Sequence, residues 1–108
     1  MSLLPFRIQT QTGETIDFEF ELHPDTGSAV RVSQLLAAVL ETIDRELKVL
    51  GETSNGDILQ SLTMATAARS RMIHAPVAQT SGLARDLMEK ALDGAATARS
   101  KDGIVGHA

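Results

Sequence analysis

Two short segments near the start of the chain alternate strictly between hydrophobic and polar residues. A period of two is typical of a β-strand with one buried face. Between the segments lies Gly13, which can adopt the positive φ that a tight turn needs. The sequence therefore predicts an antiparallel β-hairpin over residues 4–22. Its apolar face consists of Leu4, Phe6, Ile8, Ile16, Phe18, Phe20 and Leu22.

The position of the turn decides which residues of the hairpin face one another. A two-residue turn at Gly13 and Glu14 would set Ile8 opposite Glu19, on the same face. A three-residue turn over residues 12–14 sets Ile8 opposite Phe18 and keeps the apolar face intact. We predict this second register, which also pairs Phe6 with Phe20 and Leu4 with Leu22.

A long amphipathic helix is expected after the hairpin. Pro24, Asp25 and Gly27 predict a connector over residues 23–28. From about Val30 to Leu50, apolar residues recur at spacings of three and four, which is the pattern of a helix with one buried face. Gly51 is a typical residue for ending such a helix.

Two further helices are expected in the second half of the chain. Ser54 or Asn55 is the predicted N-cap of a helix that runs to about His74, where Ala75-Pro76 is expected to end it. Thr80 or Ser81 is the predicted N-cap of another helix, from about Leu83 to Ala98. In that helix Gly94 is a weak point, because glycine costs about 1 kcal/mol relative to alanine.

These elements predict an α+β fold, with an N-terminal antiparallel hairpin and three α-helices packed on its apolar face. We expect a single domain over residues 1–98 and a disordered polar tail over residues 99–108. No third strand is expected. Because an isolated hairpin is marginally stable in water, this hairpin needs its own helices or a partner.

Composition adds a reason to expect association. The 108 residues are 43% hydrophobic, but they include no Trp, no Tyr and only three Phe. Alanine-rich helices pack closely, yet each alanine buries little apolar area, so the stability of one chain alone is expected to be modest. A second copy would add buried area.

Charge and cysteine content exclude several classes of protein. The net charge is −4, and residues 1–28 carry one basic and five acidic residues. No segment is strongly basic, so no nucleic-acid partner is expected. The absence of Cys excludes disulfides and thiolate metal sites. The sequence shows no signal peptide and no apolar run long enough to span a membrane, so we expect a cytoplasmic protein with no membrane partner.

Three sets of polar residues are candidates for chemistry. Glu21, His23 and Asp25 have the spacing of metal ligands on a strand, but Pro24 interrupts the strand, so no metal site is expected. His74 is interpreted as a cation at a helix end. Phosphate cradles and nucleophile motifs are absent from the sequence, so no catalytic residue and no cofactor is expected. The third group is basic and consists of Arg69, Arg71, Arg85 and Lys90.

A run of small residues from Ser61 to Ser70 admits close approach of another backbone. Two interpretations remain open, close packing inside the chain and contact with a helix of a second chain. For the second interpretation, the predicted interface residues are Ser61, Ala65, Ala68 and Met72.

The hypothesis that follows is a small non-enzymatic interaction or accessory module, which forms a homodimer and binds a protein partner that the sequence does not identify. One alternative is a DNA-binding regulator that uses the second or third helix, although the predicted connector between them, Pro76 to Ser81, is longer than a helix-turn-helix motif uses. A second alternative is a small enzyme or ligand binder, for which the sequence offers no constellation of reactive groups.

Overall fold

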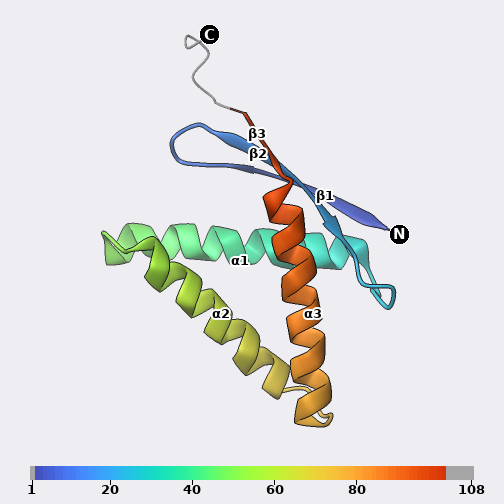
Figure 1. Ribbon diagram of the computed structural model, residues 1–108. Helices are drawn as coiled ribbons and strands as arrows, with labels where there is room; N and C mark the ends of the chain where they lie inside the picture. The colour runs from blue at the N-terminus through green and yellow to red at the C-terminus, as the bar shows by residue number, and fades with distance from the viewer. Residues whose placement is uncertain (1, 102–108) are drawn as a thin grey trace. The chain divides into compact units, whose positions relative to one another are not determined.

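The computed structural model describes residues 2–101 and has the α+β architecture that the hydrophobic pattern predicts. Two strands are followed by three helices and a short third strand (Figure 1). Their bounds are β1 Leu3–Gln9, β2 Thr15–Glu21, α1 Ala29–Leu50, α2 Asn55–Arg71, α3 Val77–Ala96 and β3 Arg99–Lys101.

The described residues fall into two compact units, each of which is described by itself. One unit contains the sheet, the start of α1 as far as Ser33, and the chain from Met88 onward. The other unit is Gln34–Leu87. The single domain expected over residues 1–98 stays a prediction.

β1 and β2 form the predicted hairpin, but in a different register. Phe6 lies opposite Phe18 and Leu4 opposite Phe20, so the predicted pairs of Phe6 with Phe20 and of Leu4 with Leu22 are wrong. The partners are displaced by two residues. Because side chains alternate between faces with a period of two, every apolar side chain keeps its predicted face.

The turn explains the displacement. The Thr10 N–H donates to the Glu14 carbonyl at 2.8 Å, and the Gly13 N–H donates to the Thr10 carbonyl at 3.0 Å. These bonds close a three-residue loop over residues 11–13, with Gly13 at its last position and φ at 89°. That position of a three-residue hairpin loop requires a left-handed conformation, which glycine adopts without steric strain. The loop is therefore one residue earlier than predicted.

Residues expected to belong to a polar tail form a third strand instead. Arg99–Lys101 pairs antiparallel with the first half of β2, which gives the strand order β1-β2-β3. The prediction of a sheet without a third strand is therefore wrong, and so is the start of the tail at residue 99. Residues 102–108 of that predicted tail lie outside the described part of the chain. Hydrophobic periodicity could not indicate β3, because none of its three side chains is apolar and all are exposed.

α3 meets β2 at Gly94, which is buried. A Cβ atom at this position would lie 2.9 Å from Cδ1 of Phe20 and 3.2 Å from the carbonyl oxygen of Glu19. The first separation is shorter than Cβ atoms show in proteins, and the second is tighter than most such contacts, so a side chain at this position would force the helix and the strand to shift apart. The helix propensity that marks Gly94 as a weak point is outweighed by its packing role.

The chain from Lys90 to Lys101 follows β2 from its end to its beginning. Lys90 Nζ lies 3.0 Å from a carboxylate oxygen of Glu21. Gly94 then contacts β2 beside Phe20, and β3 pairs with Thr15–Asp17. The last turns of α3 and the strand after it therefore line the edge of β2 that faces away from β1 (Figure 1).

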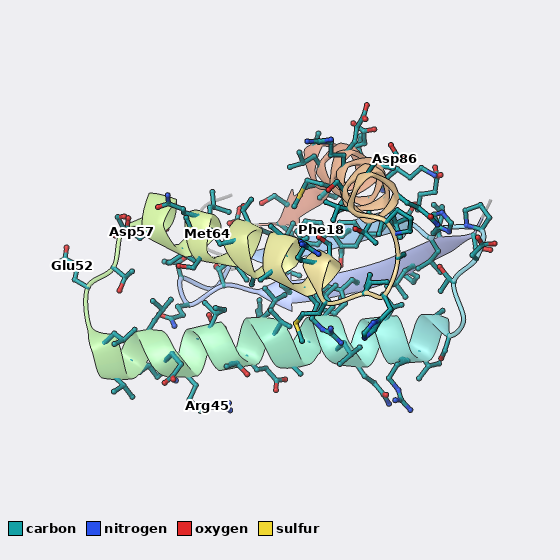
Figure 2. All side chains as sticks on the ribbon, turned by 90° about the horizontal axis from the view of Figure 1, so that it is seen from below. Phe18, Arg45, Glu52, Asp57, Met64 and Asp86 are labelled. Carbon is teal, nitrogen blue, oxygen red and sulfur yellow. The ribbon has the colours of Figure 1, made fainter. Side chains whose placement is uncertain are left out.

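The apolar face of the hairpin is only partly covered. Leu4 is the one buried hydrophobic side chain in the described chain, at 8% exposure. The rings of Phe18 and Phe20 stack with centroids 5.1 Å apart, and Figure 2 labels Phe18 on the sheet. The other apolar side chains of this face, Phe6, Ile8, Ile16 and Leu22, are half-buried.

The predicted helix signals at residues 51 and 54 are confirmed. Gly51 ends α1 with φ at 87°, and its N–H donates to the Leu47 carbonyl at 3.0 Å. Ser54 is the N-cap of α2, because its hydroxyl accepts the N–H of Asp57 at 3.1 Å. These signals are local, since each is made by residues within one turn of the helix end.

The boundary between α2 and α3 lies elsewhere than predicted. α2 ends at Arg71 instead of His74, and α3 begins at Val77, directly after Pro76. Proline disfavours helix in the residue before it but suits the first turn of the next helix, where an N–H would be unpaired in any case. Thr80 is therefore not a cap. It is buried inside α3, and its hydroxyl donates to the Val77 carbonyl at 3.2 Å.

We predict that Gly94→Ala destabilises the protein by up to about 2 kcal/mol, although alanine is the better helix former. The gain in propensity is about 1 kcal/mol, whereas forcing an extra carbon into a packed site costs about 1–3 kcal/mol. Gly82→Ala is the matched control, because a Cβ at position 82 of the same helix meets no atom within 4 Å. Gly82→Ala should be neutral or stabilising in chemical denaturation. Equal stabilisation by both substitutions would contradict the close contact at Gly94.

Candidate functional site

The four predicted interface residues form an exposed row on α2 and its C-cap. Ser61, Ala65, Ala68 and Met72 recur at spacings of four, three and four, which places them on one side of a helix. All four are exposed, and Met72 is the C-cap residue. The structure therefore brings these residues together on one accessible surface, which we call the α2 row.

The hydroxyl groups of α2 are satisfied by the helix itself. Ser61 donates to the Asp57 carbonyl at 2.9 Å, and Thr66 donates to the Leu62 carbonyl at 3.0 Å. Thr63 and Ser70 make equivalent bonds to carbonyls four and three residues before them. Because these hydroxyls already have acceptors, covering the helix with an apolar surface would leave none of them without a hydrogen bond.

Large hydrophobic side chains are widely exposed in the unit Gln34–Leu87. Leu59 is 65% exposed and Met64, labelled in Figure 2, is 60% exposed. Surface of this kind is typical of a site that contacts another protein. Eleven large hydrophobic residues of the unit are exposed, namely Leu35, Val39, Val49, Leu50, Leu59, Met64, Met72, Ile73, Val77, Leu83 and Leu87.

On the polar face of the sheet, acidic side chains lie next to basic ones. Arg7 of β1 donates two hydrogen bonds to the carboxylate of Asp17, at 2.6 and 3.2 Å. These bonds lower the pKa of Asp17 below its ordinary value, and the nearby charges of Arg99 and Lys101 act in the same direction. The same ion pair raises the pKa of Arg7. The acidity concentrated in the hairpin is thus balanced in part by basic residues of β3.

The outer edge of β1 is protected by proline. Leu22 N–H donates to the Ser2 carbonyl and Thr10 N–H to the Glu14 carbonyl, so even-numbered residues carry the bonds between β1 and β2. The main-chain groups of the odd-numbered residues, Pro5 among them, therefore face outward. Pro5 costs the β1–β2 pairing nothing, and it removes one donor from the edge that another strand would use.

Glu21, His23 and Asp25 are not assembled into a metal site. Glu21 pairs with Lys90, and His23 Nδ1 accepts the main-chain N–H of Asp25 at 3.0 Å. Within residues 2–101, no three His, Asp or Glu side chains are placed to hold a metal ion. The absence of metal binding remains a prediction.

Only two of the four basic residues, Arg69 and Arg71, lie next to the connector between α2 and α3, since Arg85 lies inside α3 and Lys90 pairs with Glu21. Arg69 and Arg71 lie in the last turn of α2, and Arg69 Nη1 approaches Met72 Sδ at 3.7 Å. The connector comprises residues 72–76, not the predicted Pro76 to Ser81, but it is still longer than in a helix-turn-helix motif. His74 lies in this connector, beyond α2, so its predicted place in the helix end is wrong.

Comparison with known proteins finds no matching family model, no matching curated protein and no matching solved structure. None of the described helices is both long enough and apolar enough to cross a membrane.

The ion pair between Arg7 and Asp17 predicts a pH dependence of stability. Because the pKa of Asp17 is lowered on folding, the pair stabilises the protein fully above the ordinary aspartate value of about 3.9. This contribution is lost as the pH falls through the lowered value. In urea unfolding between pH 2 and 6, Asp17→Asn should therefore give a flatter dependence on pH below about 4 than the unsubstituted protein.

Arg7→Gln provides the second arm of this experiment, because it removes the same ion pair and leaves the carboxylate in place. It should flatten the acid limb in a similar way. An acid limb that keeps its full slope in both variants would mean that the pair does not influence stability.

Proposed function

We propose that this protein is a non-enzymatic module that associates with a second copy of itself through its helices. The observation that carries the proposal is the imbalance of burial. Only Leu4 is a buried hydrophobic residue in the described chain, while sixteen large hydrophobic residues are exposed. Full burial of one such side chain contributes about 1.5–3 kcal/mol, so a partner that covers several of them would supply stability that the chain alone lacks.

A second copy is the partner that the surface chemistry favours. Most soluble oligomers are symmetric homodimers, in which the same surface of both subunits meets across a two-fold axis. The four side chains of the α2 row carry no charge, so they add no repulsion of their own when two copies meet. The Arg69 guanidinium, 3.7 Å from Met72 Sδ, lies at the C-terminal end of the row. The Ser61 hydroxyl in the row already donates to the Asp57 carbonyl, which lowers the cost of removing water from it.

The sheet is the weaker alternative for this contact. Pro5 interrupts the donors on the outer edge of β1, and β3 pairs with part of β2 on the other side. Glu19 and Glu21 add like charges that would meet if two hairpins paired edge to edge. These features support the helical route, with Ser61, Ala65, Ala68 and Met72 at its centre.

Small residues and large ones have separate roles in the proposed interface. Ala65 and Ala68 let two helices approach closely, and the larger side chains around them supply the area. A stable interface buries about 800 Å² on each partner, which requires more than one helical row. Met64, which lies one helical turn before Ala68 at the side of the row, is exposed and available for this purpose. A cytoplasmic location is part of the proposal and rests on the sequence alone.

Sedimentation equilibrium tests the proposal directly. We expect the mass of a dimer at micromolar protein concentration. A monomer mass that persists at high micromolar concentration would overturn self-association, whatever surface is assumed.

The position of the interface is tested by variants of α2. Ala65→Arg and Ala68→Glu should each shift the equilibrium toward monomer by at least tenfold in dissociation constant, because they place a charge where two helices meet. Ala67→Arg is the matched control. It introduces the same side chain at an exposed position of α2 that lies outside the α2 row, and the dimer should persist. A dimer that Ala65→Arg and Ala68→Glu leave unchanged would place the interface elsewhere.

A further inference from the structure

β3 is attached to the sheet without any apolar side chain. It consists of Arg99, Ser100 and Lys101, and all three are exposed. Three residue pairs join it to β2, whereas seven join β1 to β2. The attachment of β3 therefore depends on main-chain hydrogen bonds and on charge.

The basic side chains of β3 lie next to an acidic side chain of β2. Arg99 lies opposite Asp17 and Lys101 opposite Thr15, so both basic residues share the polar face of the sheet with Asp17. Arg7 approaches the same carboxylate from the other side. Asp17 thus lies in one row between two arginines, across three strands.

Further charged groups surround this row. Ser100 projects to the opposite face, where its hydroxyl donates to the Glu14 carboxylate. Glu19 and Glu21 continue the acidic face along β2, and Lys90 of α3 pairs with Glu21. β3 therefore brings two positive charges to a strand with three acidic side chains on that face.

We propose that β3 is an electrostatic latch, which closes the outer edge of β2 at low ionic strength and opens when its charges are screened or reversed. Salt acts strongly on such a contact, because charges at the surface are screened over about 10 Å at 0.1 M salt and about 3 Å at 1 M. Salt also weakens the exposed Arg7–Asp17 pair between β1 and β2, but the hairpin remains folded when the latch opens, since its seven-residue pairing and its apolar face persist when charges are screened.

Opening of the latch changes what the sheet presents to other chains. The main-chain groups of Thr15 and Asp17 lose their partners and become a template for another strand. The outer edge of β1 is a poorer template, because Pro5 has no main-chain N–H to donate to another strand. The latch therefore controls whether another strand can pair with Thr15–Asp17, the part of β2 that β3 covers.

The alternation of hydrogen bonds along β2 supplies an internal control. Even-numbered residues of β2 bond to β1, so the amides of Ile16 and Phe18 report on the hairpin. The amides of Thr15 and Arg99 lie in the pairing between β2 and β3 and report on the latch. Residue-resolved hydrogen exchange by NMR therefore separates the two events within one strand.

In the full chain, raising NaCl from 0.05 to about 1 M should speed exchange at Thr15 and Arg99 at least tenfold and leave Ile16 and Phe18 protected. The double variant Arg99→Glu, Lys101→Glu should have the same effect at low salt. Arg31→Glu, Arg85→Glu is the matched control, because it makes the same change in net charge at exposed residues outside the sheet, and β3 should stay protected in it.

Three results would overturn the latch. The first is exchange at Thr15 and Arg99 that responds neither to salt nor to the reversal of charge in β3. The second is loss of protection at Ile16 and Phe18 together with Thr15, because β3 would then open only when the hairpin unfolds. The third is equal opening in the control variant, since net charge and not the row at Asp17 would then be the cause.

Discussion

The close contact between α3 and β2 at Gly94 is the constraint on which the sheet-bearing unit depends. It allows the helix axis to approach the strand until a side chain would collide with Phe20 and with the main chain of Glu19. The same approach brings Lys90 to Glu21, and after a connection of only two residues the chain pairs with β2 as β3. With so short a connection, the position of the helix sets the register of β3, and the register in turn sets which charges meet.

The pairing of β3 with β2 changes which charges lie next to one another on the polar face of the sheet. In the hairpin alone, Asp17, Glu19 and Glu21 form an acidic row that repels other strands of the same kind. Arg7 and the basic residues of β3 turn part of that row into an alternating series around Asp17. The two outer edges of the sheet therefore differ, because Pro5 removes a donor from β1 and β3 carries two basic residues. Both devices limit uncontrolled pairing of edges.

The apolar residues are distributed differently in the two units. The hairpin concentrates them on one face, where Leu4 is buried and the phenylalanines stack. In Gln34–Leu87 they are spread over helices in which eleven large hydrophobic side chains are exposed and none is buried. With many alanines and few aromatics, such helices bury little area for each residue that they order, while the loss of conformational entropy per residue is not reduced. This imbalance supports the proposed self-association more than any single motif does.

The sequence by itself determined the elements whose signals are local. Alternation assigned the two faces of the hairpin, the spacing of Val32, Leu36 and Val39 identified α1, and Gly51 and Ser54 marked helix ends, because each depends on residues within one turn or one strand. The exposed row on α2 was also recognisable, as a run of small residues. Only the tertiary structure decided the role of Gly94, the existence of β3 and the pairing around Asp17. These features join residues that are far apart in the chain, so the local pattern around each residue carries no trace of its partner.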